Sequence, residues 1–162
     1  MTLEFLLNRE NVITEANAGT RLIDILRGPP FFLLGAKAGC LLGICGACSV
    51  IFNGKVIKAC QILAFRVHES EVMTIEGFSK SNEYQDIVKG FEKAGVETCG
   101  YCETGKILTV QTILAKNRQP TRNDILLNLG GLRCRCTEPE SLVEAVLAAA
   151  DLRQRRIYGR TA

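Results

Sequence analysis

Eight cysteines stand out in this chain of 162 residues, and they fall into two groups of four. Thiolates are strong ligands for iron and zinc, and clustered cysteines in a chain without a secretion signal are more typical of metal or redox chemistry than of disulfides. The first residues, MTLEFLLNRENV, lack a basic segment followed by an apolar one. We therefore expect a cytoplasmic protein whose cysteines are reduced and bind metal.

The first group has a spacing that favours an iron–sulfur cluster, since C-x4-C-x2-C…C is the plant-type [2Fe–2S] pattern. Three thiolates come from one loop, and the fourth comes from an adjacent strand. Zinc is more often held by two separate close pairs of ligands. The glycines of the loop permit sharp turns and let backbone N–H groups approach the sulfurs. The residues concerned are Cys40, Cys45, Cys48 and Cys60, with Gly43 and Gly46 between them.

The second group consists of two close pairs, Cys99 with Cys102 and Cys134 with Cys136. Taken alone, this pattern is compatible with zinc as well as with a second cluster. Both pairs precede predicted helices, over residues 105–117 and 140–152, and helix N-termini favour anions.

Arg133 and Arg135 flank the second group and add positive charge. We expect Arg133 to raise the reduction potential of a cluster there, because a cation favours the more negative reduced form. A solubilising role, or an ion pair with Glu138 or Glu140, is the alternative.

The elements that must position the first group are strands. Residues 2–7 alternate apolar and polar side chains, and residues 12–16 can return as a second strand. Asn53-Gly54 joins two strand-like runs as a hairpin, and residues 71–77 supply a further strand. A short helix is predicted around residues 22–27, ended by Gly28-Pro29-Pro30.

The second half has helical spacing after a polar stretch, residues 77–83, which is typical of a linker. Tyr84, Ile87 and Phe91 begin one apolar stripe, and Thr121 begins a capping-box pattern for another helix. We expect four helices packed as a bundle. The basic tail from Arg153 onward is predicted to be frayed or docked on a partner.

Several function classes are excluded by composition. The net charge of +3 comes from 20 basic and 17 acidic residues, which is too balanced to indicate nucleic-acid binding. No apolar run is long enough to span a membrane. His68 is the single histidine, so an exposed polar role is expected and no catalytic triad can be formed around it. The chemistry indicated is one-electron transfer.

Taken together, the two groups resemble the iron–sulfur subunit or domain of the molybdenum hydroxylases, a family that includes xanthine dehydrogenase, nicotinate dehydrogenase, aldehyde oxidoreductases and carbon monoxide dehydrogenase. The segments that carry the resemblance are GTRLIDILR, CGAC, TIEGF, CGYC and CRCT, which span roughly residues 2–150.

The resemblance implies an α+β fold. Residues 1–76 would form a β-grasp, plant-type ferredoxin-like domain with one [2Fe–2S] cluster, and residues 84–162 a four-helix bundle with the other. Cys99, Cys102, Cys134 and Cys136 would hold the cluster nearest a molybdopterin in a large partner subunit. The first four cysteines would hold the outer cluster, nearer an FAD-binding subunit or external acceptor. A dimer of heterotrimers is a possible assembly of this family.

The flanks of the cysteines depart from the family pattern. Thr98 stands where a glutamine usually contacts the pterin, and Leu132-Arg133 replaces the usual Asn-Leu before C-R-C. Residues 103–105 and 138–139 also differ, as do Leu42 and Ile44 in the first loop, where acidic residues are common. Two other functions stay open at this point: a free-standing two-cluster ferredoxin, and a zinc-stapled assembly module.

Overall fold

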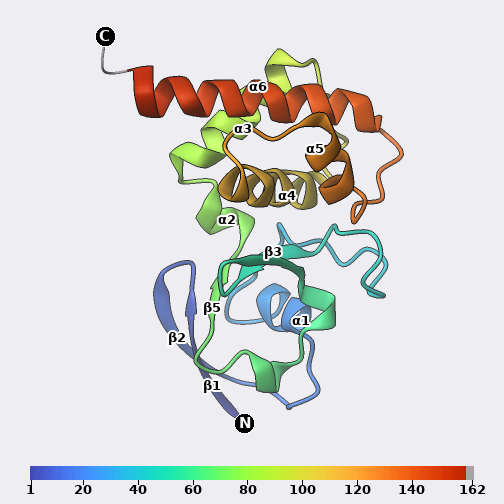
Figure 1. The fold of residues 1–162 in the computed structure, drawn as a ribbon. Helices are drawn as coiled ribbons and strands as arrows, with labels where there is room; N and C mark the ends of the chain where they lie inside the picture. Colours follow the sequence, from blue (N-terminus) through green and yellow to red (C-terminus); the bar gives the residue numbers. More distant parts are fainter. Residues whose placement is uncertain (160–162) are drawn as a thin grey trace.

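The computed structural model describes residues 1–159, and it shows a mixed α/β protein. Figure 1 shows a sheet-containing half, where the N-terminus lies, and a helical half at the opposite end, where the described chain finishes. The two cysteine groups lie on loops around the junction of these halves, so the junction is what positions the candidate site.

A five-stranded sheet, counted over the described residues, forms the first half in the order β2-β1-β5-β3-β4. β1 and β5 are parallel, and the other neighbours are antiparallel. The predicted hairpin is confirmed, because Asn53 and Gly54 both take positive φ angles (48° and 75°) between β3 and β4. The predicted strand over residues 71–77 is shorter than expected. The strands are β1 Thr2–Leu7, β2 Glu10–Glu15, β3 Ser49–Phe52, β4 Lys55–Lys58 and β5 Glu71–Met73.

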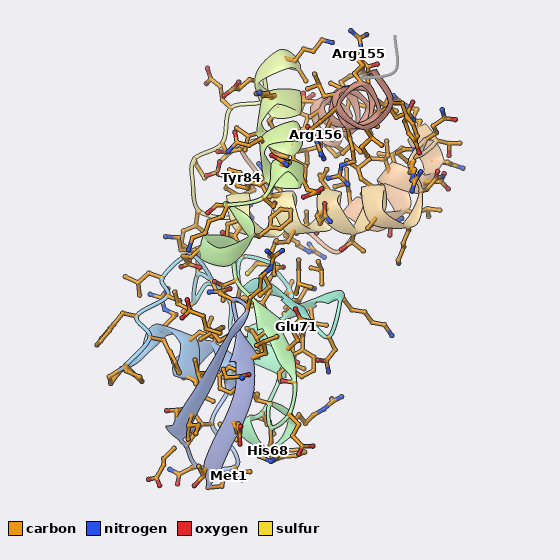
Figure 2. All side chains as sticks on the ribbon, turned by 90° about the vertical axis from the view of Figure 1, so that its left-hand side faces the viewer. Met1, His68, Glu71, Tyr84, Arg155 and Arg156 are labelled. Atoms are coloured by element: carbon orange, nitrogen blue, oxygen red, sulfur yellow. The ribbon has the colours of Figure 1, made fainter. Side chains whose placement is uncertain are left out.

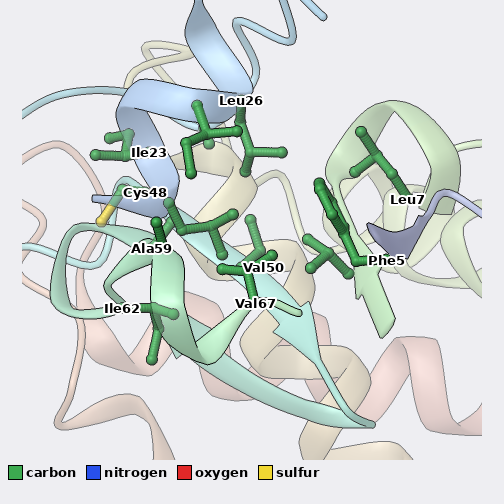
Figure 3. Close-up of a cluster of buried hydrophobic side chains, with 14 of the residues drawn as sticks. Phe5, Leu7, Ile23, Leu26, Cys48, Val50, Ala59, Ile62 and Val67 are labelled. Atoms are coloured by element: carbon green, nitrogen blue, oxygen red, sulfur yellow. The ribbon is translucent and has the colours of Figure 1, made fainter. Parts of the chain in front are cut away.

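One apolar core fills the space between this sheet and helix α1 (Leu22–Arg27). Leu3, Phe5 and Leu7 point into it from β1, as their alternation predicted. Figure 3 shows this packing, with Cys48 at its border beside Ala59. Two short 3-10 helices, η1 (Ala59–Gln61) and η2 (Ala64–Arg66), close the core. Cys48 and Cys60 of the first group are thereby anchored in this core.

A second core lies among the helices of the other half. The predicted capping box at Thr121 is present, since its hydroxyl accepts from the Asp124 N–H while the Asp124 carboxylate accepts from the Thr121 N–H. α3 and α6 pack closely where Gly90 meets Ala149, because a methyl group on Gly90 would lie 2.7 Å from the Ala149 Cβ. The helices are α2 Ile75–Phe78, α3 Asn82–Lys93, α4 Glu103–Lys116, α5 Arg122–Leu129 and α6 Pro139–Tyr158.

The prediction of a frayed tail is wrong for residues 153–158. α6 runs six residues past the predicted end at residue 152 and holds Arg153 buried against α3. Arg156 lies between α6 and α3 in Figure 2 and donates to both carboxylate oxygens of Asp86, with distances of 2.8–3.2 Å. Ion pairing to the buried Asp86 therefore fixes this end of the helix. Residues 160–162 of the tail lie outside the described residues.

The two halves are joined by direct packing. Ile51, Val56 and Met73 turn from the sheet toward the second core, and the Thr104 hydroxyl of α4 donates to the Gly35 carbonyl oxygen at 2.9 Å. α2 and the first residues of α3 occupy much of the segment 77–83 that was predicted as a linker. This packing therefore fixes the position of one cysteine group relative to the other.

Candidate metal centres

The first group of cysteines lies on a long loop and on η1. The hairpin brings Cys48 and Cys60 together, because Cys48 precedes β3, Cys60 follows β4, and the Ala59 N–H donates to the Cys48 carbonyl at 3.0 Å. Cys40 and Cys45 stand on the loop before β3, half-buried at the surface. Three of the thiols thus lie on one loop, as predicted, whereas Cys60, which was expected on a strand, lies in η1 directly after β4.

Backbone N–H groups surround the thiol of Cys40. The N–H groups of Cys45, Leu42 and Ile44 point at its sulfur at 3.3–3.4 Å and lower the pKa of Cys40 to about 6. Gly43 and Gly46 have φ angles of +74° and +78°, so the loop takes the left-handed turns that glycine was predicted to allow.

The inner thiols of the first group have a different environment. Burial raises the pKa of Cys48 to about 11, and the neighbouring Cys60 thiol adds to that effect. Gln61 also approaches the Cys60 sulfur through its side-chain amide, at 3.5 Å. The loop end of this group therefore favours negative charge, while the core end excludes water.

The second group lies at the beginnings of two helices, as predicted. Cys102 is the N-cap of α4, and Cys134 and Cys136 precede α6. Burial raises the pKa of Cys102 to about 11. Burial opposes ionisation of Cys134 too, but the N–H groups of Cys136 and Thr137 outweigh it and lower the pKa of Cys134 to about 7. Cys99 and Cys136 are exposed.

In both groups the thiols lie close enough to shift one another's pKa values. Cys45 acts on Cys40, and both Cys60 and Cys45 act on Cys48. In the second group, Cys136 and Cys134 act on Cys99, and Cys134 and Cys99 act on Cys102. Over residues 1–159, no three histidine, cysteine or acidic side chains converge as ligands of one metal ion would. A [2Fe–2S] cluster takes four thiolates, two for each iron. The donor set of each group therefore fits a two-iron cluster.

The loops that carry the two groups touch each other. A methyl group on Gly105 would lie 2.4 Å from the Gly46 carbonyl oxygen, so only glycine permits this approach. The Leu132 side chain covers Gly46, and the Arg133 N–H donates to the Cys45 carbonyl at 3.3 Å. The exposed Tyr101 lies against Gly39 of the first loop. The two sites are thus neighbours, which their separation in sequence did not reveal.

The remaining predicted site residues are placed as follows. Arg133 and Arg135 are exposed, and in the described part of the chain neither forms an ion pair. Glu140 pairs with Arg122 instead. Thr98 is half-buried next to Cys99. His68 is exposed, as expected, and accepts from the Glu4 N–H at 3.2 Å.

One residue of the second site was missed at the sequence level. Lys106 lies in the first turn of α4 and is 1% exposed. Its ammonium group acts on the thiols of Cys102, Cys134 and Cys136. The available signal was its spacing, because a residue four positions after Cys102 shares its helix face.

Comparison with known proteins agrees with this geometry. Residues 74–147 match the family described as the [2Fe-2S] binding domain, and residues 33–95 match the 2Fe-2S iron-sulfur cluster binding domain. The nicotinate dehydrogenase small FeS subunit of Eubacterium barkeri is 41% identical over 85% of this chain and 87% of its own length. The xanthine dehydrogenase iron-sulfur-binding subunit of Escherichia coli O157:H7 is 35% identical, over 91% of this chain and 92% of its own length.

The chain belongs to the small iron–sulfur subunits of the molybdenum hydroxylases. A chain of quinoline 2-oxidoreductase from Pseudomonas putida 86 has the same fold, with a TM-score of 0.87 at 28% identity over 98% of this chain and 97% of that one. The protein is accordingly the electron-transfer subunit of a multi-subunit oxidoreductase, with [2Fe–2S] clusters as cofactors and a large subunit as partner. Of the three functions considered from the sequence, the comparisons support this one. No helix in residues 1–159 has the length and apolar character of a membrane span.

Proposed function

We propose that each cysteine group holds one cluster, and that each interacting pair binds one iron. The pairs are Cys40 with Cys45 and Cys48 with Cys60 in the first site, and Cys99 with Cys136 and Cys102 with Cys134 in the second. The gathering of the eight cysteines at two neighbouring sites, four at each, is the single observation that carries the proposal. The separate cores support a β-grasp domain at residues 1–76 and a four-helix bundle at residues 84–162, linked by residues 77–83.

The two sites present different faces to partners. Cys99, Tyr101 and Cys136 are exposed around the second site, so a large molybdopterin-binding subunit covers it in our proposal, with Thr98 near the pterin. Leu42 and Ile44, 70% and 49% exposed, form an apolar rim on the first site. We assign that rim to an FAD-binding subunit. The assembly proposed is a cytoplasmic dimer of heterotrimers.

When bound, [2Fe–2S] clusters accept and release single electrons. The residues of this chain perform three tasks for them. The N–H groups around Cys40 stabilise negative charge on the thiolates. The two cores shield Cys48, Cys60 and Cys102 from water. The contact between Gly46 and Gly105 keeps the two sites adjacent, which favours transfer between them.

Iron and sulfide analysis of the purified complex, combined with EPR of the reduced protein, tests the assignment. Two sites of two irons each give about four irons per copy of this chain. Cys60→Ala should remove the signal of the first site and Cys136→Ala that of the second, each with about half of the iron. His68→Gln is a matched surface control and should keep both signals. Zinc without sulfide, or loss of both signals in each cysteine variant with the protein still folded, would contradict the assignment.

A further inference from the structure

Lys106 is the largest fully buried side chain in the described part of the chain. Burying an ammonium group is costly unless an anion or several acceptors lie beside it. A lysine at such a position is therefore held there by something that compensates its charge.

The protein neighbours of Lys106 compensate it only in part. Its Nζ donates to the Thr137 hydroxyl at 2.7 Å, and that hydroxyl lies 3.2 Å from the Glu97 carbonyl oxygen, to which it donates. None of the ion pairs found in residues 1–159 includes Lys106. Its partner Thr137 directly follows Cys136 in the chain, so the ammonium group lies beside the second site.

Lys106 also lies one helical turn after Cys102, the N-cap of α4, so chain segments from both cysteine pairs of the second site lie beside it. In agreement with this placement, its charge acts to lower the pKa values of Cys134, Cys102 and Cys136. The charge of this one cation therefore affects three of the four thiols of the second site.

Within residues 1–159 the buried cationic side chains are Lys106 and Arg153, and neither lies at the first site. At its exposed loop end, three backbone N–H groups donate to the Cys40 sulfur. Lys58 reaches the first loop but is only partly buried, and it donates to the Gly43 carbonyl oxygen at 2.7 Å. The two sites thus differ in that a full charge is fixed inside one of them.

We propose that Lys106 sets the reduction potential of the second site, holding it above the value that the same thiolates would have around a neutral side chain. The inference rests on the proposed ligand assignment. Reduction adds one electron and no proton, so the site becomes more negative by one charge, and the nearby ammonium stabilises that product more than the oxidised form. Because the cation is buried, added salt should screen its effect little.

A potentiometric titration of the purified complex, followed by EPR, tests this directly. Lys106→Met keeps most of the hydrocarbon stem and removes the charge. We expect the equilibrium constant for reducing the second site to fall at least tenfold, which is about 59 mV for one electron. The first site should shift less. Lys116→Met, at the exposed end of the same helix, should change neither potential.

Iron analysis of the same samples separates the possible failures. Native protein without iron and sulfide would defeat the proposed function itself. Full iron with an unchanged second potential in Lys106→Met would overturn the role of Lys106 alone. If Lys106→Met and Lys106→Gln both lose the second site's signal while Lys106→Arg keeps it, the cation is needed for assembly, which supports the inference. Loss in Lys106→Arg as well would assign the requirement to shape and overturn it.

Discussion

Replacing Gly105 by alanine should destabilise the junction between the two cysteine groups. The added methyl group would lie 2.4 Å from the Gly46 carbonyl oxygen and 3.1 Å from the Leu132 side chain. Ordinary contacts begin near 3.4 Å, so one of the two backbones must move by about 1 Å. Leu132 can rotate, but the carbonyl is fixed in the loop that holds Cys45 and Cys48.

Helix propensity and overpacking have opposite effects on the free energy of unfolding of Gly105→Ala. Alanine is a better helix former than glycine by about 1 kcal/mol. Overpacking costs about 1–3 kcal/mol, and we take the upper end because the obstacle is backbone. The variant should therefore lose about 2 kcal/mol of the free energy of unfolding. For a chain of this size that corresponds to a fall of about 4–8 °C in the melting temperature.

Thermal melting of the iron-loaded protein, with EPR of both sites, measures this effect. Gly131→Ala is the matched control, since an added methyl group there meets nothing within 4 Å, and its stability should stay within about 0.5 kcal/mol of the native value. A melting temperature of Gly105→Ala equal to or above that of the native protein would refute the close-approach argument, because the gain in helix propensity would then exceed the cost of the steric contact.

Three further perturbations have expected outcomes. Asp86→Ala should lower the free energy of unfolding by about 3 kcal/mol in a denaturant titration, because it removes the buried partner of Arg156; native-like stability would contradict this. Arg133→Leu should lower the second site's potential, by an amount that shrinks with added salt because Arg133 is exposed, and an unchanged potential would contradict it. In the metal-free chain at pH 7, Cys40, with a pKa of about 6, should be alkylated well before Cys48, whose pKa is about 11, and raising the pH toward 9 should add little to the Cys40 rate; equal labelling in mass spectrometry would contradict it.

Short-range patterns in the sequence predicted the local elements. The alternation in β1, the Asn53-Gly54 turn and the capping box at Thr121 are decided by residues within a few positions of one another, and all three are present. The first cysteine group was predictable for the same reason, because three of its thiols and their glycines share one loop.

Long-range packing decided the rest. The extension of α6 through residues 153–158 depends on Asp86 and Glu83 of α3, some seventy positions away, so the basic tail alone could not indicate it. The pairing of thiols in the second group, across a gap of thirty-one residues, depends on where α4 and α6 begin in space. The burial of Lys106 depends on both. By itself the sequence indicated two groups of four cysteines as candidate metal ligands, because their spacing is local. Only the tertiary structure decided that the groups touch and that a lysine is buried beside the second one, because contacts between distant segments leave no periodic pattern in the sequence.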